Sequence, residues 1–189
     1  MMGRLLFVIA AGLLAQLPAV RVQPVDGGPS RIDPFAAPAG VKAIVFLFTT
    51  TDCPISNRYA PEVKRLSSAF VPQGVLFRLI YPDPTEDTTA IRAHMAAFSY
   101  AGAMQALRDP KHALVAAVGA TITPEAVVYA DGRVQYRGRI DDRYVDLGVE
   151  RPAATEHDLA DALTAVLAGK PVAHPETQPV GCYIADVAR

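Results

Sequence analysis

The feature that most constrains this chain is a strand-length run over residues 42–48, apolar after Lys42, which leads into a cysteine. An apolar run of strand length without alternation is typical of a strand buried on both faces, as at the centre of a parallel sheet. Threonines 49–51 end the run, and Cys53-Pro54 comes next. Apolar residues then recur at helical intervals, at Ala60, Val63, Leu66 and Phe70. The sequence therefore predicts a buried strand, a helix that starts near Cys53, and a kink or late helix start at Pro61.

The next segments continue this alternation and end in a hairpin. The sequence predicts a strand at 74–81, a helix at 88–98, a short strand at 107–110 and a short helix at 111–118. Two β-rich runs, 124–129 and 133–137, flank Asp131-Gly132, and Asp-Gly between such runs is a strong hairpin signal. Alternating strands and helices before a hairpin predict an α/β fold with a central mixed sheet and helices on both faces.

Composition divides the chain into four predicted parts. Arg4 and the apolar stretch from Leu5 to Leu14 make residues 1–20 typical of a secretory signal peptide. The stretch is shorter than the roughly 20 apolar residues that span a bilayer, and an uncleaved anchor is the alternative. We expect a proline-rich linker or an irregular entry to the domain at 21–40, a domain at 41–170 and a tail at 171–189 that carries Cys182. An exported protein of this kind would work in an oxidising compartment, the periplasm or the cell exterior.

Two further features concern a loop and the charge balance. A polar loop is expected at 141–154, and Thr155 with Asp158 resembles a capping box that opens a helix at 156–167.

The 189 residues carry a formal net charge of −1 without a run of Lys or Arg. Nucleic acids need clustered cations, so we expect no nucleic-acid partner. We also expect no cofactor, and no stable membrane span once the signal is cleaved.

Cys53 is the strongest candidate for chemistry. Free amides and the helix dipole at a first helical turn stabilise an anion, so the pKa of Cys53 should fall from about 8.5 toward about 3.5–7.5. Ser56 stands where a Cys-x-x-Cys motif has its second sulfur, and its hydroxyl can donate to a thiolate but cannot close a disulfide. A resolving thiol must come from Cys182, the other cysteine of the chain, or from another molecule. The alternative role for Cys53 is that of a small buried core residue.

Several stretches, in order along the chain, carry a resemblance to a known family. Residues 48–62, with Thr50 and Cys53-Pro54-Ile55-Ser56, are similar to the active-site stretch of redoxin-type, peroxiredoxin-like (AhpC/TSA-type) proteins of the thioredoxin superfamily. Residues 120–126 resemble the loop that carries the superfamily's cis-proline. Residues 136–143 resemble the segment after that loop in this branch, and residues 180–184 resemble the ending of the branch's chains. The likeness covers roughly residues 40–184.

The resemblance implies a thioredoxin-like fold with a nucleophilic thiol at Cys53. It also implies a cis bond between Thr123 and Pro124 beside the sulfur, where the Thr123 backbone would pair with a substrate chain. From the residues alone, a trans proline that begins a strand is the usual state. Thr50 matches the threonine of the peroxiredoxin motif Pro-x-x-x-Thr-x-x-Cys, but Phe46 stands at its proline position.

Other departures from the family weaken two specific activities. Peroxiredoxins use a distant arginine to polarise the peroxide; Arg137 and Arg139 are candidates, but solvated strand residues explain them equally well. Thioredoxins carry two cysteines in the motif and this chain carries one. Sco-type copper chaperones share the fold but use a Cys-x-x-x-Cys pair, and the four histidines here are scattered, so we expect no bound metal.

Three hypotheses for function remain open. In the first, an exported thiol–disulfide oxidoreductase or peroxiredoxin-like antioxidant attacks a protein disulfide or a hydroperoxide with Cys53. Cys182 then resolves the intermediate, and a redox partner protein supplies electrons. In the second, the chain is a non-catalytic module that binds copper or a partner protein. In the third, Cys53 and Cys182 form a structural disulfide that pins the tail. The placement of Cys53 favours the first.

Overall fold

A six-stranded mixed sheet forms the centre of the computed structural model, which describes residues 20–27 and 30–185. Its order is β1 (Gln23–Pro24), β4 (Gln105–Arg108), β3 (Val75–Tyr81), β2 (Ala43–Phe48), β6 (Glu125–Ala130) and β7 (Arg133–Gly138). β2, β3 and β4 are parallel, whereas β6, β7 and β1 each run antiparallel to their neighbours. The predicted mixed sheet is therefore confirmed.

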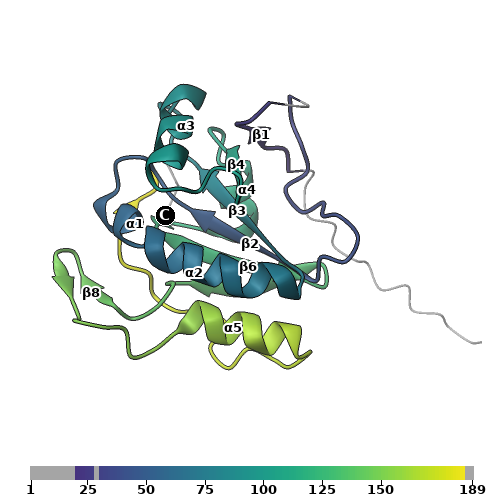
Figure 1. Cartoon of the computed structure of the whole chain (residues 1–189), viewed down its shortest axis with the longest axis vertical. Helices are drawn as coiled ribbons and strands as arrows, with labels where there is room; N and C mark the ends of the chain where they lie inside the picture. The colour runs from purple at the N-terminus through teal and green to yellow at the C-terminus, as the bar shows by residue number, and fades with distance from the viewer. Residues whose placement is uncertain (1–19, 28–29, 186–189) are drawn as a thin grey trace, which may run out of the picture.

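Helices cover both faces of this sheet (Figure 1). The helices are α1 (Pro54–Arg58), α2 (Ala60–Phe70), α3 (Thr88–Ala97), α4 (Ala113–Val118) and α5 (Asp158–Leu167), and a 3₁₀ turn η1 (Val71–Gln73) comes after α2. Val45 and Leu47 of β2 face the core beneath α1, α2, α3 and α5. Phe46, between them, faces the second core, to which α4 contributes. Because successive strand residues point to opposite faces, burial on both sides explains why β2 lacks polar residues.

Two local predictions about helix and turn geometry are also confirmed. α1 ends at Arg58 and α2 begins at Ala60, so the helix restarts where Pro61 falls in a first turn. In the hairpin between β6 and β7, Asp131 has φ 52° and Gly132 has φ 76°, which is the left-handed geometry that a tight hairpin turn requires.

Part of the segment 21–40, expected as a linker or an irregular entry to the domain, belongs to the fold. β1 pairs with β4 at the edge of the sheet, where a proline without an N–H is tolerated. Val22 and Val25 are each 1% exposed. The buried guanidinium of Arg78 donates to the carbonyl of Ala36 at 2.9 Å. These valines, spaced among prolines and glycines, carry no periodic signal that would identify a strand.

The predicted capping box at the start of α5 is wrong. α5 begins at Asp158 behind His157, and no side chain caps it. Thr155 instead donates its hydroxyl and its N–H to Asp142, both at 2.6 Å. The N–H of Glu156 donates to the same carboxylate at 2.9 Å. The buried carboxylate thus recruits the residues that local sequence assigned to the helix.

Two small antiparallel sheets complete the described structure. β8 (Tyr144–Asp146) and β9 (Val149–Glu150) form a projecting hairpin within the predicted polar loop (Figure 1). β10 (Cys182–Tyr183) pairs with β5 (Ile122–Thr123), which returns the C-terminal segment to α1. Among the residues described, no helix combines the length and apolar character needed to span a bilayer. All of the predicted signal except Val20 lies outside the described residues.

Candidate active site

Cys53 lies where the buried strand β2 gives way to α1. Its backbone is extended (φ −72°, ψ 112°), which makes it the N-cap residue, and Pro54 occupies the first turn. The residue is 1% exposed. It is nevertheless at a helix start, where amides without intrahelical partners can stabilise an anion. Cys53 therefore combines a buried position with a local environment that favours a thiolate.

The C-terminal segment brings Cys182 directly onto Cys53. β10 pairs with β5 so that Cys182 lies opposite Thr123, and the N–H of Ile184 donates to the carbonyl of Thr121 at 3.0 Å. The Cys182 thiol donates to Cys53, with 3.0 Å between the two sulfurs. The Cys53 thiol donates to the carbonyl of Thr123 at 3.2 Å. The structure thus brings together three of the predicted site residues.

The loop that carries Thr123 is held by a buried carboxylate that was not among the predicted site residues. The Thr123–Pro124 bond is cis, as the resemblance implied. Glu125 Oε2 accepts the N–H groups of Thr121 at 2.7 Å and Ile122 at 3.1 Å. Burial raises the pKa of Glu125, while these hydrogen bonds and the charge of Arg137 oppose that rise. A carboxylate inside an otherwise apolar strand was the available signal for this role.

The two thiols have opposite pKa shifts. Burial by itself raises the pKa of Cys53, but hydrogen bonds from the Cys182 thiol, from the Ser56 hydroxyl and from the Ser56 N–H outweigh burial and lower it. The pKa of Cys182 rises to about 12, because the side chain is partly buried and donates its hydrogen to Cys53. The pair therefore concentrates negative charge on Cys53 and keeps the proton on Cys182.

Ser56 and Thr50 occupy different positions around this pair. The Ser56 hydroxyl is buried and has no hydrogen-bond partner other than Cys53 among the described residues, so it is free to donate to a Cys53 thiolate. Thr50 lines a cavity of about 200 Å³ together with Cys182 and Thr123. Cys53 is absent from that lining. Thr50 therefore lines the same cavity as Cys182, and Cys53 does not line it.

Neither candidate arginine lies free beside Cys53. Arg137 is engaged by Glu125 at 3.7 Å and by Glu176, and it donates to the carbonyl of Gly119 at 2.6 Å. Arg139 pairs with Asp158 at 2.7 Å. Both guanidinium groups therefore have structural partners, and neither lines the cavity beside Cys182.

A buried polar network fixes the loop that precedes Cys53. Asn57 donates to the carbonyl of Thr51 at 3.1 Å and accepts from His94 Nε2 at 2.8 Å. The hydroxyl of Tyr81 forms a hydrogen bond with His94 Nδ1 at 2.8 Å, and burial lowers the pKa of the imidazole. On the other side, Glu86 accepts the Thr51 N–H at 2.5 Å. The sequence offered only a weak signal for this network, a histidine on the apolar side of a predicted helix.

One group of side chains could hold a metal ion. Among the described residues, ligand atoms of Glu62, Asp141 and His157 lie within 4.8 Å of one another. Arg65 already pairs with Glu62 at 2.6 Å, so a cation would have to displace it. Both ring nitrogens of His94 are in hydrogen bonds and are not free to act as ligands.

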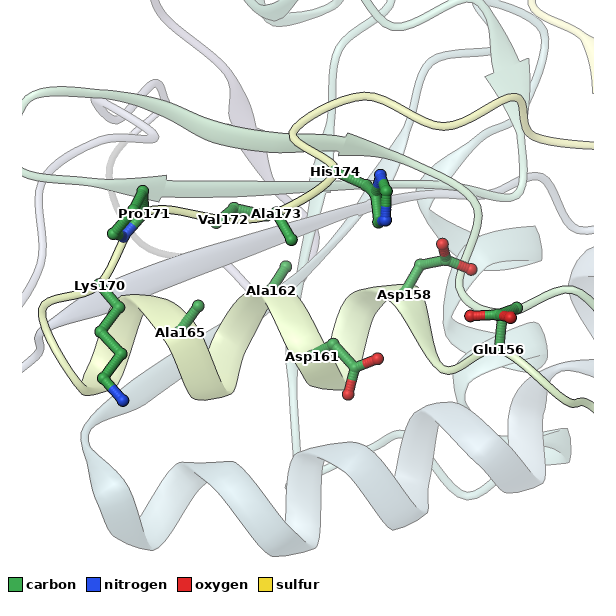
Figure 2. A pocket seen from close by; sticks show the side chains of 10 residues that line it. All are labelled: Glu156, Asp158, Asp161, Ala162, Ala165, Lys170, Pro171, Val172, Ala173 and His174. Carbon is green, nitrogen blue, oxygen red and sulfur yellow. The ribbon is translucent and has the colours of Figure 1, made fainter.

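A second cavity lies away from the cysteines. It has a volume of about 410 Å³ and lies between α5 and the segment that comes after it (Figure 2). Asp158 and Asp161 of α5 line it, together with Lys170 and His174 of the segment after α5. No residue of the Cys53 region contributes to this cavity.

Comparison with known proteins supports the fold. No protein-family model and no curated protein matches the chain. Its structure is similar to that of an uncharacterized conserved protein from Geobacillus kaustophilus, with 26% identity, a TM-score of 0.74 and 92% of each chain covered. It is also similar to a hypothetical protein from Sinorhizobium meliloti 1021, with 23% identity, a TM-score of 0.72 and 92% of this chain and 94% of that chain covered.

A third similar structure is a secreted disulfide oxidoreductase from Mycobacterium tuberculosis, described as homologous to E. coli DsbE. It has 20% identity and a TM-score of 0.53, with 80% of this chain and 96% of that chain covered. A thiol–disulfide oxidoreductase from Bacteroides fragilis is a further neighbour. With its mixed sheet, its helices on both faces and these neighbours, the chain has a thioredoxin-like fold.

Proposed function

We propose that this protein is an exported thiol oxidoreductase whose working unit is the pair Cys53 and Cys182. The observation that carries the proposal is the 3.0 Å between their sulfurs at the start of α1. A disulfide bond is about 2.0 Å long, so a small approach of the two sulfurs suffices to form it. The neighbours that act as disulfide oxidoreductases support the same chemistry.

Within this pair, Cys53 is the nucleophile and Cys182 the resolving thiol. Because hydrogen bonds lower the pKa of Cys53, it supplies the thiolate that attacks. A protein disulfide substrate displaces β10 from Thr123; the Cys53 sulfur then bonds to one substrate sulfur, and the other substrate sulfur leaves as a thiolate. With a hydroperoxide, Cys53 becomes a sulfenic acid and an alcohol or water leaves. Cys182 then attacks Cys53 in either case and closes the intramolecular disulfide.

The remaining residues have supporting roles in this proposal. Ser56 stabilises the Cys53 thiolate through its hydroxyl and N–H. Thr123 and Pro124 position the backbone of β5, with which Cys182 pairs. Since both candidate arginines have structural partners, we favour a disulfide substrate over a hydroperoxide. Thr50 would contact a substrate that enters the cavity beside Cys182.

Export and the domain division belong to the same proposal. Residues 1–20 would direct the chain out of the cytoplasm, and an oxidising compartment would supply disulfide substrates and a redox partner protein. The domain at 41–170 would carry Cys53 and the tail at 171–189 would carry Cys182. Fusing residues 1–20 to an export reporter, beside a fusion in which a charge interrupts the apolar stretch, tests this part.

Mass analysis of the reduced protein after oxidation tests the redox proposal. Stoichiometric glutathione disulfide and hydrogen peroxide form separate arms. We expect wild type to lose two thiols and form a monomeric Cys53–Cys182 disulfide, fastest with glutathione disulfide. Cys182→Ser should instead stop at a glutathione adduct or sulfenic acid on Cys53. If neither oxidant yields the intramolecular disulfide, the proposal fails; a disulfide that excess glutathione cannot reduce would favour a purely structural bridge.

A further inference from the structure

The two cysteines differ in what can reach them. Cys53 is 1% exposed, and the C-terminal segment lies over it. Cys182 is partly exposed and lines the cavity of about 200 Å³. A small thiol that enters this cavity therefore meets Cys182 and not Cys53.

The C-terminal strand also occupies the backbone edge next to Cys53. β5 pairs with β10, with Cys182 opposite Thr123. Gly181 lies so close that a Cβ there would come within 2.0 Å of the Thr123 carbonyl oxygen. No further strand can pair with Thr123 while β10 is in place, because its ladder positions are already used. Direct exchange of an external thiol at Cys53 would require β10 to leave, whereas exchange at Cys182 would not.

We propose that external thiols reduce the Cys53–Cys182 disulfide by attacking Cys182 through this cavity. The inference rests on the proposed function, since it requires that disulfide. The sulfur of the external thiolate bonds to Cys182 Sγ, the Cys53–Cys182 bond breaks, and its electron pair stays on Cys53 as a thiolate. A second external thiolate then attacks the first external sulfur. This step gives an external disulfide, and Cys182 takes a proton from solvent.

The chemistry of the leaving group agrees with this direction of attack. The thiol with the lower pKa leaves faster in thiol–disulfide exchange. Hydrogen bonds lower the pKa of Cys53, whereas that of Cys182 is raised to about 12. Attack at Cys182 releases the better leaving group, and attack at Cys53 would release the poorer one.

Charge around the cavity adds a preference among thiols. Asp52 and Asp83 line it, and no Lys or Arg lines it among the described residues. An additional negative charge on the entering thiol is repelled, and a positive charge is attracted. Coulomb energies near a solvated surface make one such charge worth about a threefold change in rate at low salt. Cysteamine should therefore react faster than 3-mercaptopropionate when rates are compared per thiolate.

Peptide mapping of a trapped intermediate tests the site of attack. Oxidised wild type is treated briefly with glutathione, quenched in acid and alkylated. We expect glutathione on Cys182 and the alkyl group on Cys53; glutathione on Cys53 would overturn the inference. Failure to form the starting disulfide would instead count against the proposed function, so the two failures are distinguishable.

Rates with charged thiols test the route independently of trapping. In Asp83→Asn, the ratio of the cysteamine rate to the 3-mercaptopropionate rate should fall about threefold, because one carboxylate of the cavity is gone. Asp161→Asn is the matched control, since Asp161 lies on α5 and lines the other cavity. A ratio that is the same in wild type and Asp83→Asn would contradict entry through the cavity beside Cys182.

Discussion

Replacing Gly181 with alanine should separate the two cysteine sulfurs without unfolding the domain. An alanine Cβ at this position would lie 2.0 Å from the Thr123 carbonyl oxygen, where contacts of a real Cβ stay beyond 3.0 Å. β10 must therefore move from β5 by at least about 1 Å. A shift of that size along the sulfur–sulfur direction would lengthen the present 3.0 Å to about 4 Å.

This shift should affect the redox pair strongly and the overall stability weakly. Misplacement of reacting groups by about 1 Å can cost about 10²-fold in rate, so closure of the Cys53–Cys182 disulfide should slow by up to that factor. Loss of the hydrogen bond from Cys182 should also raise the pKa of Cys53. β10 contributes a two-residue ladder, and the loss of one or two such hydrogen bonds costs about 1–2 kcal/mol.

The assay measures disulfide closure in glutathione disulfide, beside the pH midpoint of Cys53 alkylation and the free energy of unfolding. Gly102→Ala is a matched control: its φ of 77° strains an alanine, but nothing lies within 4 Å of the added Cβ. The control should lose about 1 kcal/mol of stability and keep the wild-type rate of closure. If Gly181→Ala closes as fast as wild type and keeps its alkylation midpoint, the steric reasoning is refuted.

Three other single residues give further predictions. Cys182→Ala should move the alkylation midpoint of Cys53 to higher pH, because the hydrogen bond that most lowers its pKa is lost; an unchanged midpoint would contradict this. Asp109→Asn should cost about 2 kcal/mol in urea unfolding, because Asp109 accepts the N–H groups of the first turn of α4 and an amide nitrogen cannot. Burial lowers the pKa of His94, so the unfolded chain binds more protons below about pH 6.5; wild type should lose stability there relative to His94→Gln.

Local patterns predicted the elements whose surroundings are uniform. β2 is apolar throughout because both its faces are buried, and this produces a signal that neighbouring residues alone can show. The hairpin at Asp131-Gly132 could be predicted equally well, since the turn itself requires a left-handed backbone. The resemblance, and not periodicity, supplied the cis bond at Thr123–Pro124.

Features that depend on distant partners were not predictable in this way. Thr155 had the spacing of a capping box, but Asp142 supplies a buried carboxylate that binds it more favourably. Glu86 and Asn57 meet at Thr51 although they lie far apart in the sequence, and nothing in the spacing of these residues indicates that contact. Long-range polar contacts of this kind set the geometry of the loop before Cys53.

The same difference between local and long-range contacts also explains how the pKa of Cys53 is set. A helix start can be recognised from Cys53-Pro54, and it indicates where a thiolate would be stabilised. The thiol that provides the largest stabilising hydrogen bond lies 129 residues further along the chain. Its position depends on Gly181, because only a residue without a side chain lets β10 approach the Thr123 carbonyl. The acidity of Cys53 is thus a property of the tail's register on β5 as much as of the helix, and changes in the tail should alter it.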